Sequence, residues 1–292
     1  MIETTPEGYK LLVRTDGSKE FMIDSDRIAA CIEYIRQNDI RFIGINSFLG
    51  YRKSDISFLH EVADFIEGIT VPEVYPDISV LNSLHKLRTL GFADNKKTVI
   101  DLSNFPNLSS LACEFSKRIL SLETCEQLRS LTLTRFKSTD RTLEELPRLA
   151  SLTTLDLFIP NVASLLGIGK FPILRELTLF KASHLDDISA LKNVKDTLKI
   201  LEFDSCKRIG NYETLSEMKA LNRLIIVNSA PIQSLSFVYA LANLEFLSFV
   251  GTNLVDGDLS PVIGLNYVGF ENKQHYSHRF EELIHLQKRG KS

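Results

Sequence analysis

A five-point apolar pattern recurs nine times between Leu81 and Phe270, at intervals of 20 to 24 residues. The clearest part of the pattern is Leu-x-x-Leu-x-Leu, in which other apolar residues such as Phe92, Cys113 and Val268 replace some leucines. Two more apolar residues lie six and three positions upstream, or one step further upstream in the sixth unit. The first leucines are Leu87, Leu108, Leu128, Leu152, Leu174, Leu198, Leu221, Leu244 and Leu265. No polar residue interrupts any column, so this periodicity constrains the fold more than any other feature of the chain.

The spacing predicts the local structure of each unit. The Leu-x-Leu portion alternates with period two, which places both side chains on one side of a short strand. The upstream pair, three residues apart, is typical of a helical or 3₁₀ turn that faces the same interior. One unit cannot cover its own apolar face, but stacked units can, and each fully buried large side chain contributes roughly 1.5–3 kcal/mol.

The pattern resembles the short, roughly 22-residue class of leucine-rich repeats, which includes bacterial internalins and the leucine-rich regulator of a protein phosphatase. The resemblance implies an α/β solenoid, a curved horseshoe with a parallel concave β-sheet and short helical or 3₁₀ convex segments. It also implies a scaffold that binds other proteins.

One column departs from the family pattern. The family places Asn two residues beyond the strand, where it hydrogen-bonds neighbouring turns. Here the column reads Asn95, Ser116, Phe136, Pro160, Ala182, Cys206, Ser229, Thr252 and Lys273. We therefore expect loops that are less regular than in an ideal member.

The ends of the chain are expected to cap the stack, because a terminal repeat exposes its core unless polar structure covers it. Residues 1–39 are interpreted as a hairpin (9–23) followed by an amphipathic helix, with Ser25 as its N-cap. This segment is either a cap or a small module with a contact of its own. Residues 40–80 then form irregular first repeats, 81–274 regular repeats, and 275–292 a closing helix (about 277–287) and a basic tail.

Composition excludes several classes of function. A net charge of −3 without a long basic run disfavours nucleic-acid binding. No apolar run approaches the ~20 residues of a membrane span, and the first residues do not resemble a signal peptide. The four cysteines are scattered, which fits free thiols in a cytoplasmic protein.

Motifs for chemistry are weak. His275 and His278 have no accompanying ligand cluster, and Gly167–Lys170 lacks the full phosphate-loop spacing. We therefore expect no catalytic residue, cofactor, metal or small-molecule substrate.

The outward residues of the central strands form the candidate partner-binding surface. It combines aromatic anchors with charged neighbours, as interface hot spots do. Its members are Phe115, Arg135, Phe136, Asp156, Phe158, Ile159, Glu176, Phe180, Lys181, Glu202 and Asp204. The alternative is that some phenylalanines, above all Phe115 and Phe136, turn inward to pack the loops. A smaller group is Arg223, Ile225, Val227, Phe246 and Val250.

Three functions compete at this point. The first is a non-enzymatic protein that binds a partner protein through the concave face, with an inhibitor or immunity-type protein as its specific form. The second is an enzyme or enzyme subunit with chemistry in the first 80 residues, which include Cys31 and His60. The third is a structural oligomer.

Overall fold

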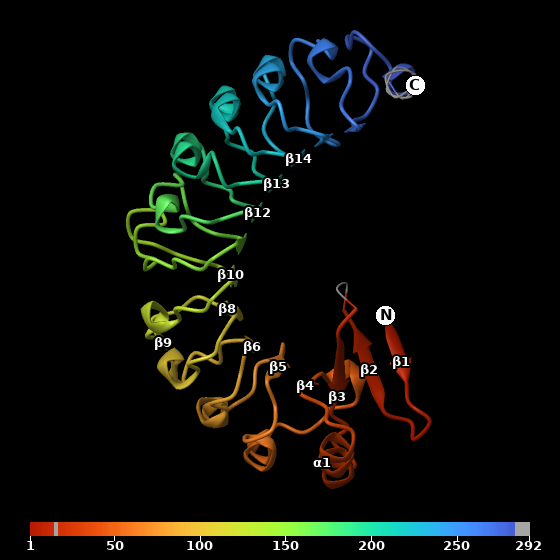
Figure 1. Ribbon diagram of the computed structural model, residues 1–292, viewed down its shortest axis with the longest axis vertical. Coiled ribbons are helices and arrows are strands. Elements are labelled where there is room, and N and C mark those ends of the chain that lie inside the picture. The colour runs from red at the N-terminus through yellow and green to blue at the C-terminus, as the bar shows by residue number, and fades with distance from the viewer. Residues whose placement is uncertain (15–16, 284–292) are drawn as a thin grey trace. The chain divides into compact units, whose positions relative to one another are not determined.

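The computed structural model describes residues 1–14 and 17–283, and the chain divides into two compact units. Unit 1 is Met1–Ser130 and unit 2 is Leu131–Ser292. Each unit has a β-sheet with 3₁₀ turns behind it (Figure 1). Each sequence repeat therefore forms one strand and one turn, as a solenoid requires.

Unit 1 begins with antiparallel strands and continues as a parallel sheet. Strand β1 pairs antiparallel with β2, β2 pairs antiparallel with β3, and β3 joins the parallel strands through β4. The strands of the sheet are, in order, β1 (Ile2–Thr4), β2 (Lys10–Val13), β3 (Lys19–Met22), β4 (Phe42–Gly44), β5 (Gly68–Val71), β6 (Thr89–Phe92) and β8 (Ser110–Glu114). Strands β7 (Ile100–Asp101) and β9 (Ile119–Leu120) form a separate parallel pair.

The 3₁₀ turns of unit 1 are η1 (Ser47–Leu49), η2 (Ser57–Val62), η3 (Ser79–Ser83), η4 (Leu102–Asn104) and η5 (Leu122–Thr124). Strands β4 and β5 lie in the segment 40–80, and they pair in parallel with the buried residues Ile43 and Ile69 opposite each other.

The N-terminal hairpin and helix are confirmed, but the start of the helix differs from the expectation. Helix α1 (Ile28–Gln37) has Arg27 at its N-cap, without a side-chain hydrogen bond to the helix. The Ser25 hydroxyl instead donates to the Gly50 carbonyl at 3.2 Å and accepts from the Arg52 amide at 3.1 Å. Ser25 therefore ties the hairpin–helix connection to the first repeat, and the N-cap prediction is wrong because this longer-range pairing takes its hydroxyl.

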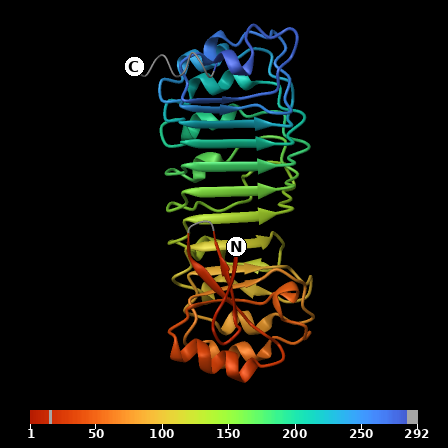
Figure 2. The same ribbon diagram turned by 90° about the vertical axis from the view of Figure 1, so that its right-hand side faces the viewer.

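Unit 2 is a parallel sheet whose strands run side by side in one direction (Figure 2). Its strands are β10 (Ser130–Thr134), which begins at the unit boundary, β11 (Thr154–Phe158), β12 (Glu176–Phe180), β13 (Ile200–Asp204), β14 (Arg223–Val227), β15 (Phe246–Ser248) and β16 (Tyr267–Gly269). Its 3₁₀ turns are η6 (Ile168–Lys170), η7 (Ser189–Val194), η8 (Tyr212–Glu217), η9 (Ser236–Ala240) and η10 (Ser260–Val262).

The register of unit 2 is the one that the leucine columns predict. Leu177 pairs with Leu201 and Leu179 with Phe203, and these side chains are fully buried. Each turn therefore adds its apolar residues to one continuous core, and the strand residues between them face the other side of the sheet.

Asn161, which lies outside the asparagine column, and the hydroxyl residues Ser229 and Thr252 within it form hydrogen bonds between neighbouring turns. The Asn161 carboxamide, one residue beyond the column, accepts from the Ser138 amide at 3.0 Å and donates to the Ser138 carbonyl at 3.1 Å. Further on, the Ser229 hydroxyl accepts from the Cys206 amide at 3.0 Å, and the Thr252 hydroxyl accepts from the Ser229 amide at 2.9 Å. Buried backbone groups thus keep partners in these turns although the repeat lacks its usual residue.

The C-terminal closing helix lies largely outside the described residues. Residues 280–283 are helical, and Leu283 is buried. The remainder of the expected helix and the basic tail lie beyond the part of the chain that the structure describes.

Candidate functional site

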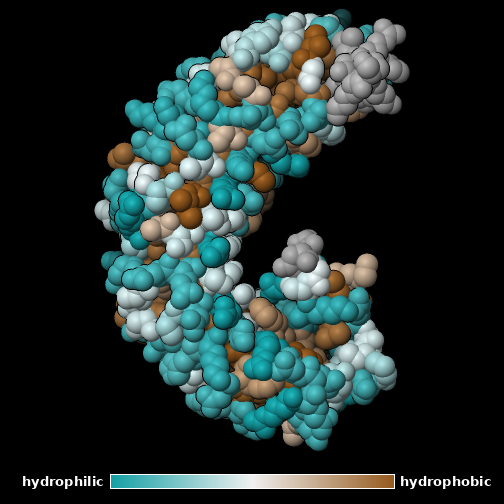
Figure 3. Space-filling model, viewed as in Figure 1, coloured by the Kyte–Doolittle hydropathy of each residue, from teal (hydrophilic) through white to brown (hydrophobic). Residues whose placement is uncertain are grey.

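The open face of unit 2 is the side of the sheet formed by the strand residues that alternate with the buried leucines. Parallel, in-register pairing arranges these residues in columns that cross the strands. The first column is Thr154, Glu176, Ile200, Arg223, Phe246 and Tyr267; the middle column is Asp156, Thr178, Glu202, Ile225 and Ser248; the last is Phe158, Phe180, Asp204 and Val227. Figure 3 shows the molecule from the same side as Figure 1, and the residues visible there are mostly hydrophilic, with small hydrophobic patches among them.

Two phenylalanines stand side by side at the ends of β11 and β12. Phe158 and Phe180 are register partners whose ring centroids lie 5.8 Å apart, and both side chains are half-buried. The Lys181 ammonium lies 4.9 Å from the centroid of the Phe180 ring, within the range of a cation–π interaction. We call Phe158, Phe180 and Lys181 the first aromatic group.

The backbone turns sharply after each strand and presents one residue to solvent. Arg135, Ile159 and Lys181 have φ values of 53°, 55° and 53°, in the left-handed region. The amides of Ile159 and Lys181 still donate to the next strand, to Phe180 at 2.8 Å and to Asp204 at 2.8 Å. The sheet hydrogen bonding therefore fixes these residues at its edge, and all three are exposed.

Carboxylates occupy the centre of the open face. Asp156 accepts from the Thr132 hydroxyl at 3.2 Å, and Asp204 accepts from the Ser205 hydroxyl at 2.8 Å. Burial raises the pKa of Glu202, and the nearby negative charge of Asp204 raises it further. Asp156, Glu202 and Asp204 thus concentrate negative charge on β11 and β13, and we call them the carboxylate group.

A second aromatic group lies at the other end of the first column. The Phe246 and Tyr267 rings stack with centroids 4.4 Å apart and an interplanar angle of 10°. The Arg223 guanidinium carbon lies over the Phe246 ring, 3.7 Å from its centroid. Tyr267, which is 43% exposed, and Ile200 were missed from the sequence although the register places both in the column of Arg223.

Two of the expected surface residues do not belong to this face. Phe136 is fully buried, so its assignment to an exposed partner-binding surface is wrong. It stands in the asparagine column, where a large apolar side chain fills the loop interior. Phe115 lies in unit 1 and is half-buried. The remaining expected residues in unit 2 are exposed or half-buried.

Cys31 and His60, the candidates for a rival chemistry in the first 80 residues, have different hydrogen-bond partners. Cys31 is buried, and burial raises the pKa of its thiol. The Nδ1 atom of His60 lies 3.3 Å from the Ser83 hydroxyl oxygen. Within residues 1–14 and 17–283, no group of three or more His, Cys, Asp or Glu side chains is placed to hold a metal ion.

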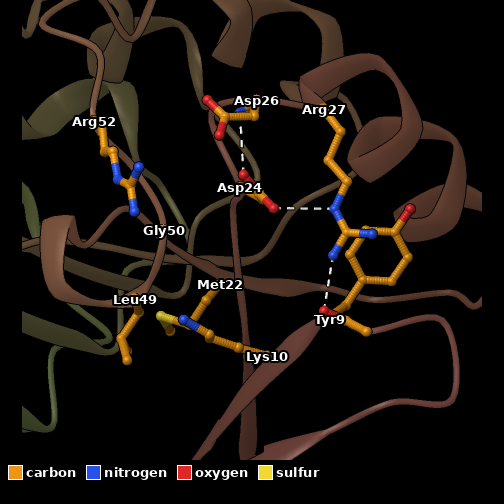
Figure 4. A pocket seen from close by; sticks show the side chains of 10 residues that line it. Tyr9, Lys10, Met22, Asp24, Asp26, Arg27, Leu49, Gly50 and Arg52 are labelled. Carbon is orange, nitrogen blue, oxygen red and sulfur yellow. Dashed lines mark hydrogen bonds and ion pairs between the residues drawn. The ribbon is translucent and has the colours of Figure 1, made fainter.

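A small cavity of about 150 Å³ beside the start of α1 has charged walls (Figure 4). Arg27 dominates it: its guanidinium pairs with Asp24 at 3.0 Å, donates to the Gly8 carbonyl at 2.8 Å and lies over the Tyr9 ring. These contacts join the helix to the β1–β2 connection, so the cavity is explained by the attachment of the hairpin.

The repeated strands, the 3₁₀ turns and the buried leucine columns define a leucine-rich-repeat solenoid, so the chain is a leucine-rich-repeat protein by its fold. No protein-family model and no curated protein sequence matches it. Among solved structures, the internalin InlF from Listeria monocytogenes is similar with a TM-score of 0.61 and 18% identity, over 82% of this chain and 70% of that chain. The internalin C2 of the same organism is similar with a TM-score of 0.50 and 16% identity, over 83% and 92%.

The fold typically mediates protein–protein interactions. None of the helices in the described residues is long and apolar enough to cross a membrane.

Proposed function

We propose that this protein is a non-enzymatic binding protein that recognises a partner protein through the open face of unit 2. The observation that carries the proposal is the pairing of two aromatic groups with a carboxylate group on one uncovered sheet face. Aromatic side chains and arginine dominate the energetics of protein interfaces, and a rigid sheet presents them at little cost in conformational entropy.

The proposed contact residues follow from this geometry. They are Arg135, Asp156, Phe158, Ile159, Glu176, Phe180, Lys181, Glu202 and Asp204, with Arg223, Phe246 and Tyr267 as an extension of the same face. A rigid face of this kind can act by covering the surface with which its partner binds or acts on other molecules, as an inhibitor or immunity-type protein does. The analogy with other proteins of this fold supports that role.

We also propose a reducing, cytoplasmic setting. Cys31, Cys113, Cys125 and Cys206 are all buried free thiols. Burial raises the pKa of Cys125 and of Cys206 to about 11, which keeps them as unreactive thiols at neutral pH.

Comparative capture from lysate of the native host tests the function. The bait is the wild-type chain beside a Phe158→Ala/Phe180→Ala/Lys181→Ala variant. A matched control, Leu166→Ala/Ile173→Ala/Tyr239→Ala, removes exposed apolar side chains of unit 2 that lie outside the open face. We expect one protein to be retained by the wild type and the control and lost from the open-face variant, with all three baits equally folded by circular dichroism. Equal retention by all three would contradict the site.

A further inference from the structure

The order of side chains across the open face has a consequence for the chemistry of the partner. Going from β11 to β16, the first aromatic group comes first, the carboxylate group overlaps it, and the second aromatic group comes last. Adjacent strands are ~4.8 Å apart, so Phe180 on β12 and Phe246 on β15 are separated by roughly 14 Å along the sheet. Glu202 and Asp204 on β13 lie between these two apolar anchors, whereas Asp156 lies on β11, the strand of Phe158.

Two neighbouring cations lie over aromatic rings of the open face. Lys181 and Arg223 lie over the Phe180 and Phe246 rings, at 4.9 Å and 3.7 Å from the centroids. Burial and the negative charges of Asp204 and Asp156 raise the pKa of Glu202, whereas Arg223 lowers it, and the net shift is upward. Asp156 accepts a hydrogen bond from the Thr132 hydroxyl, and Asp204 accepts one from the Ser205 hydroxyl. The carboxylate group therefore concentrates negative charge where a bound partner would exclude water, and a cation from the partner would offset that charge.

We propose that the partner is a protein that inserts an arginine, flanked by apolar side chains, between Asp156, Glu202 and Asp204. This inference deepens the proposed function and rests on it. A planar guanidinium can bond two carboxylates at once and is desolvated more readily than an ammonium. Its apolar neighbours would contact Phe158 and Phe180 on one side and Phe246 and Tyr267 on the other. An inorganic cation fits less well, because the described residues offer no metal-binding cluster.

A displayed library of random peptides of about 12 residues, which span ~40 Å when extended, tests the inference without knowledge of the natural partner. The library is selected on the whole chain and, in parallel, on two variants of equal charge. The first is Asp156→Asn/Glu202→Gln/Asp204→Asn. The second, the control, is Asp186→Asn/Glu213→Gln/Glu217→Gln, which changes exposed acidic residues away from the open face.

We expect the wild type and the control to enrich peptides with an arginine between apolar residues. These peptides should bind the open-face charge variant about 10-fold more weakly or worse. Replacing the peptide arginine by its neutral isostere citrulline should cause a similar loss of affinity for the wild type. It should cause little further loss of affinity for the open-face charge variant, because the two changes remove the same interaction.

Two negative results are distinguishable. Peptides that lose affinity on Phe158→Ala/Phe180→Ala but carry no arginine, or bind equally well with citrulline, would overturn this inference and leave the proposed function intact. A selection that yields no peptide dependent on Phe158 and Phe180 would overturn both.

Discussion

Ile159 is held in an unfavourable backbone conformation at the edge of the open face. Its φ of 55° lies in the left-handed region, where a β-branched residue is a genuine outlier, and its side chain is 46% exposed. Asn228 occupies the equivalent position after β14, with a φ of 48°. Asparagine tolerates this conformation, so the two positions form a natural comparison.

We predict that Ile159→Asn raises the free energy of unfolding by about 1 kcal/mol, because it relieves this strain. The reciprocal change Asn228→Ile should lower it by a similar amount. Urea unfolding followed by circular dichroism measures both. If neither substitution moves the midpoint, the left-handed backbone costs nothing at these positions and the argument is wrong.

The raised pKa of Glu202 makes the stability of the protein depend on pH. An acid whose pKa is raised in the folded state binds its proton more tightly there than in the unfolded state. The contribution of Glu202 to stability is therefore greatest below its ordinary pKa of 4.5 and falls as the pH rises through the raised pKa. We therefore predict that Glu202→Gln unfolds at a higher urea concentration than the wild type at pH 7, and that the difference shrinks below about pH 4.5.

Glu217→Gln is the control for this comparison, because Glu217 is exposed on η8, away from the carboxylate group. It should leave the pH profile unchanged. A Glu202→Gln variant that is less stable than the wild type at pH 7 would show that burial and carboxylate repulsion do not destabilise the ionised Glu202.

At the scale of the element, each repeat depends on hydrogen bonds that hold its loop to the next. Ser229 is buried, and its hydroxyl accepts from the Cys206 amide and contacts the Val227 carbonyl at 2.8 Å. Ser229→Ala leaves the buried Cys206 amide without this partner. We predict a loss of about 1–3 kcal/mol in the free energy of unfolding, against almost none for the exposed Ser236→Ala. Equal effects of the two substitutions would rule out a structural role for the ladder.

The repeat register could be predicted from the sequence because each leucine column is set by a fixed spacing along the chain. The pairing of Leu177 with Leu201 follows from that spacing alone. The ladder could not be predicted, since Asn161 stands one residue away from the expected column and hydroxyl groups act in later turns. Whether a side chain such as Phe136 points inward depends on the volume that its neighbours leave unfilled, which spacing does not reveal.

The candidate site was predictable to a similar extent. The period of two identifies Asp156, Phe158 and Glu202 as outward-facing residues. It does not reveal that Tyr267 stacks on Phe246, because that contact depends on side-chain rotamers across two strands. The start of α1 was missed for a related reason: the hydroxyl of Ser25 bonds a residue that is distant in sequence.

At the scale of the whole molecule, a solenoid transmits a local defect mainly to the neighbouring repeats. Leu201 is fully buried on β13, between β12 and β14. We predict that Leu201→Ala costs about 2–5 kcal/mol and that amide hydrogen exchange rises most in β12, β13 and β14. Exchange in β16 should change less. A uniform increase over all strands of unit 2 would mean that the unit unfolds only as a whole.

Photo-crosslinking in host lysate tests most directly whether a partner occupies the open face. Phe180 is replaced by p-benzoyl-phenylalanine in one sample. In another, the same replacement is made at Tyr239, a 70% exposed residue of η9 outside that face. We predict a single crosslinked protein at position 180, absent at position 239 and lost when Phe158 is also changed to alanine. The same crosslinked protein at both positions, or one at position 239 alone, would contradict recognition through the open face of unit 2.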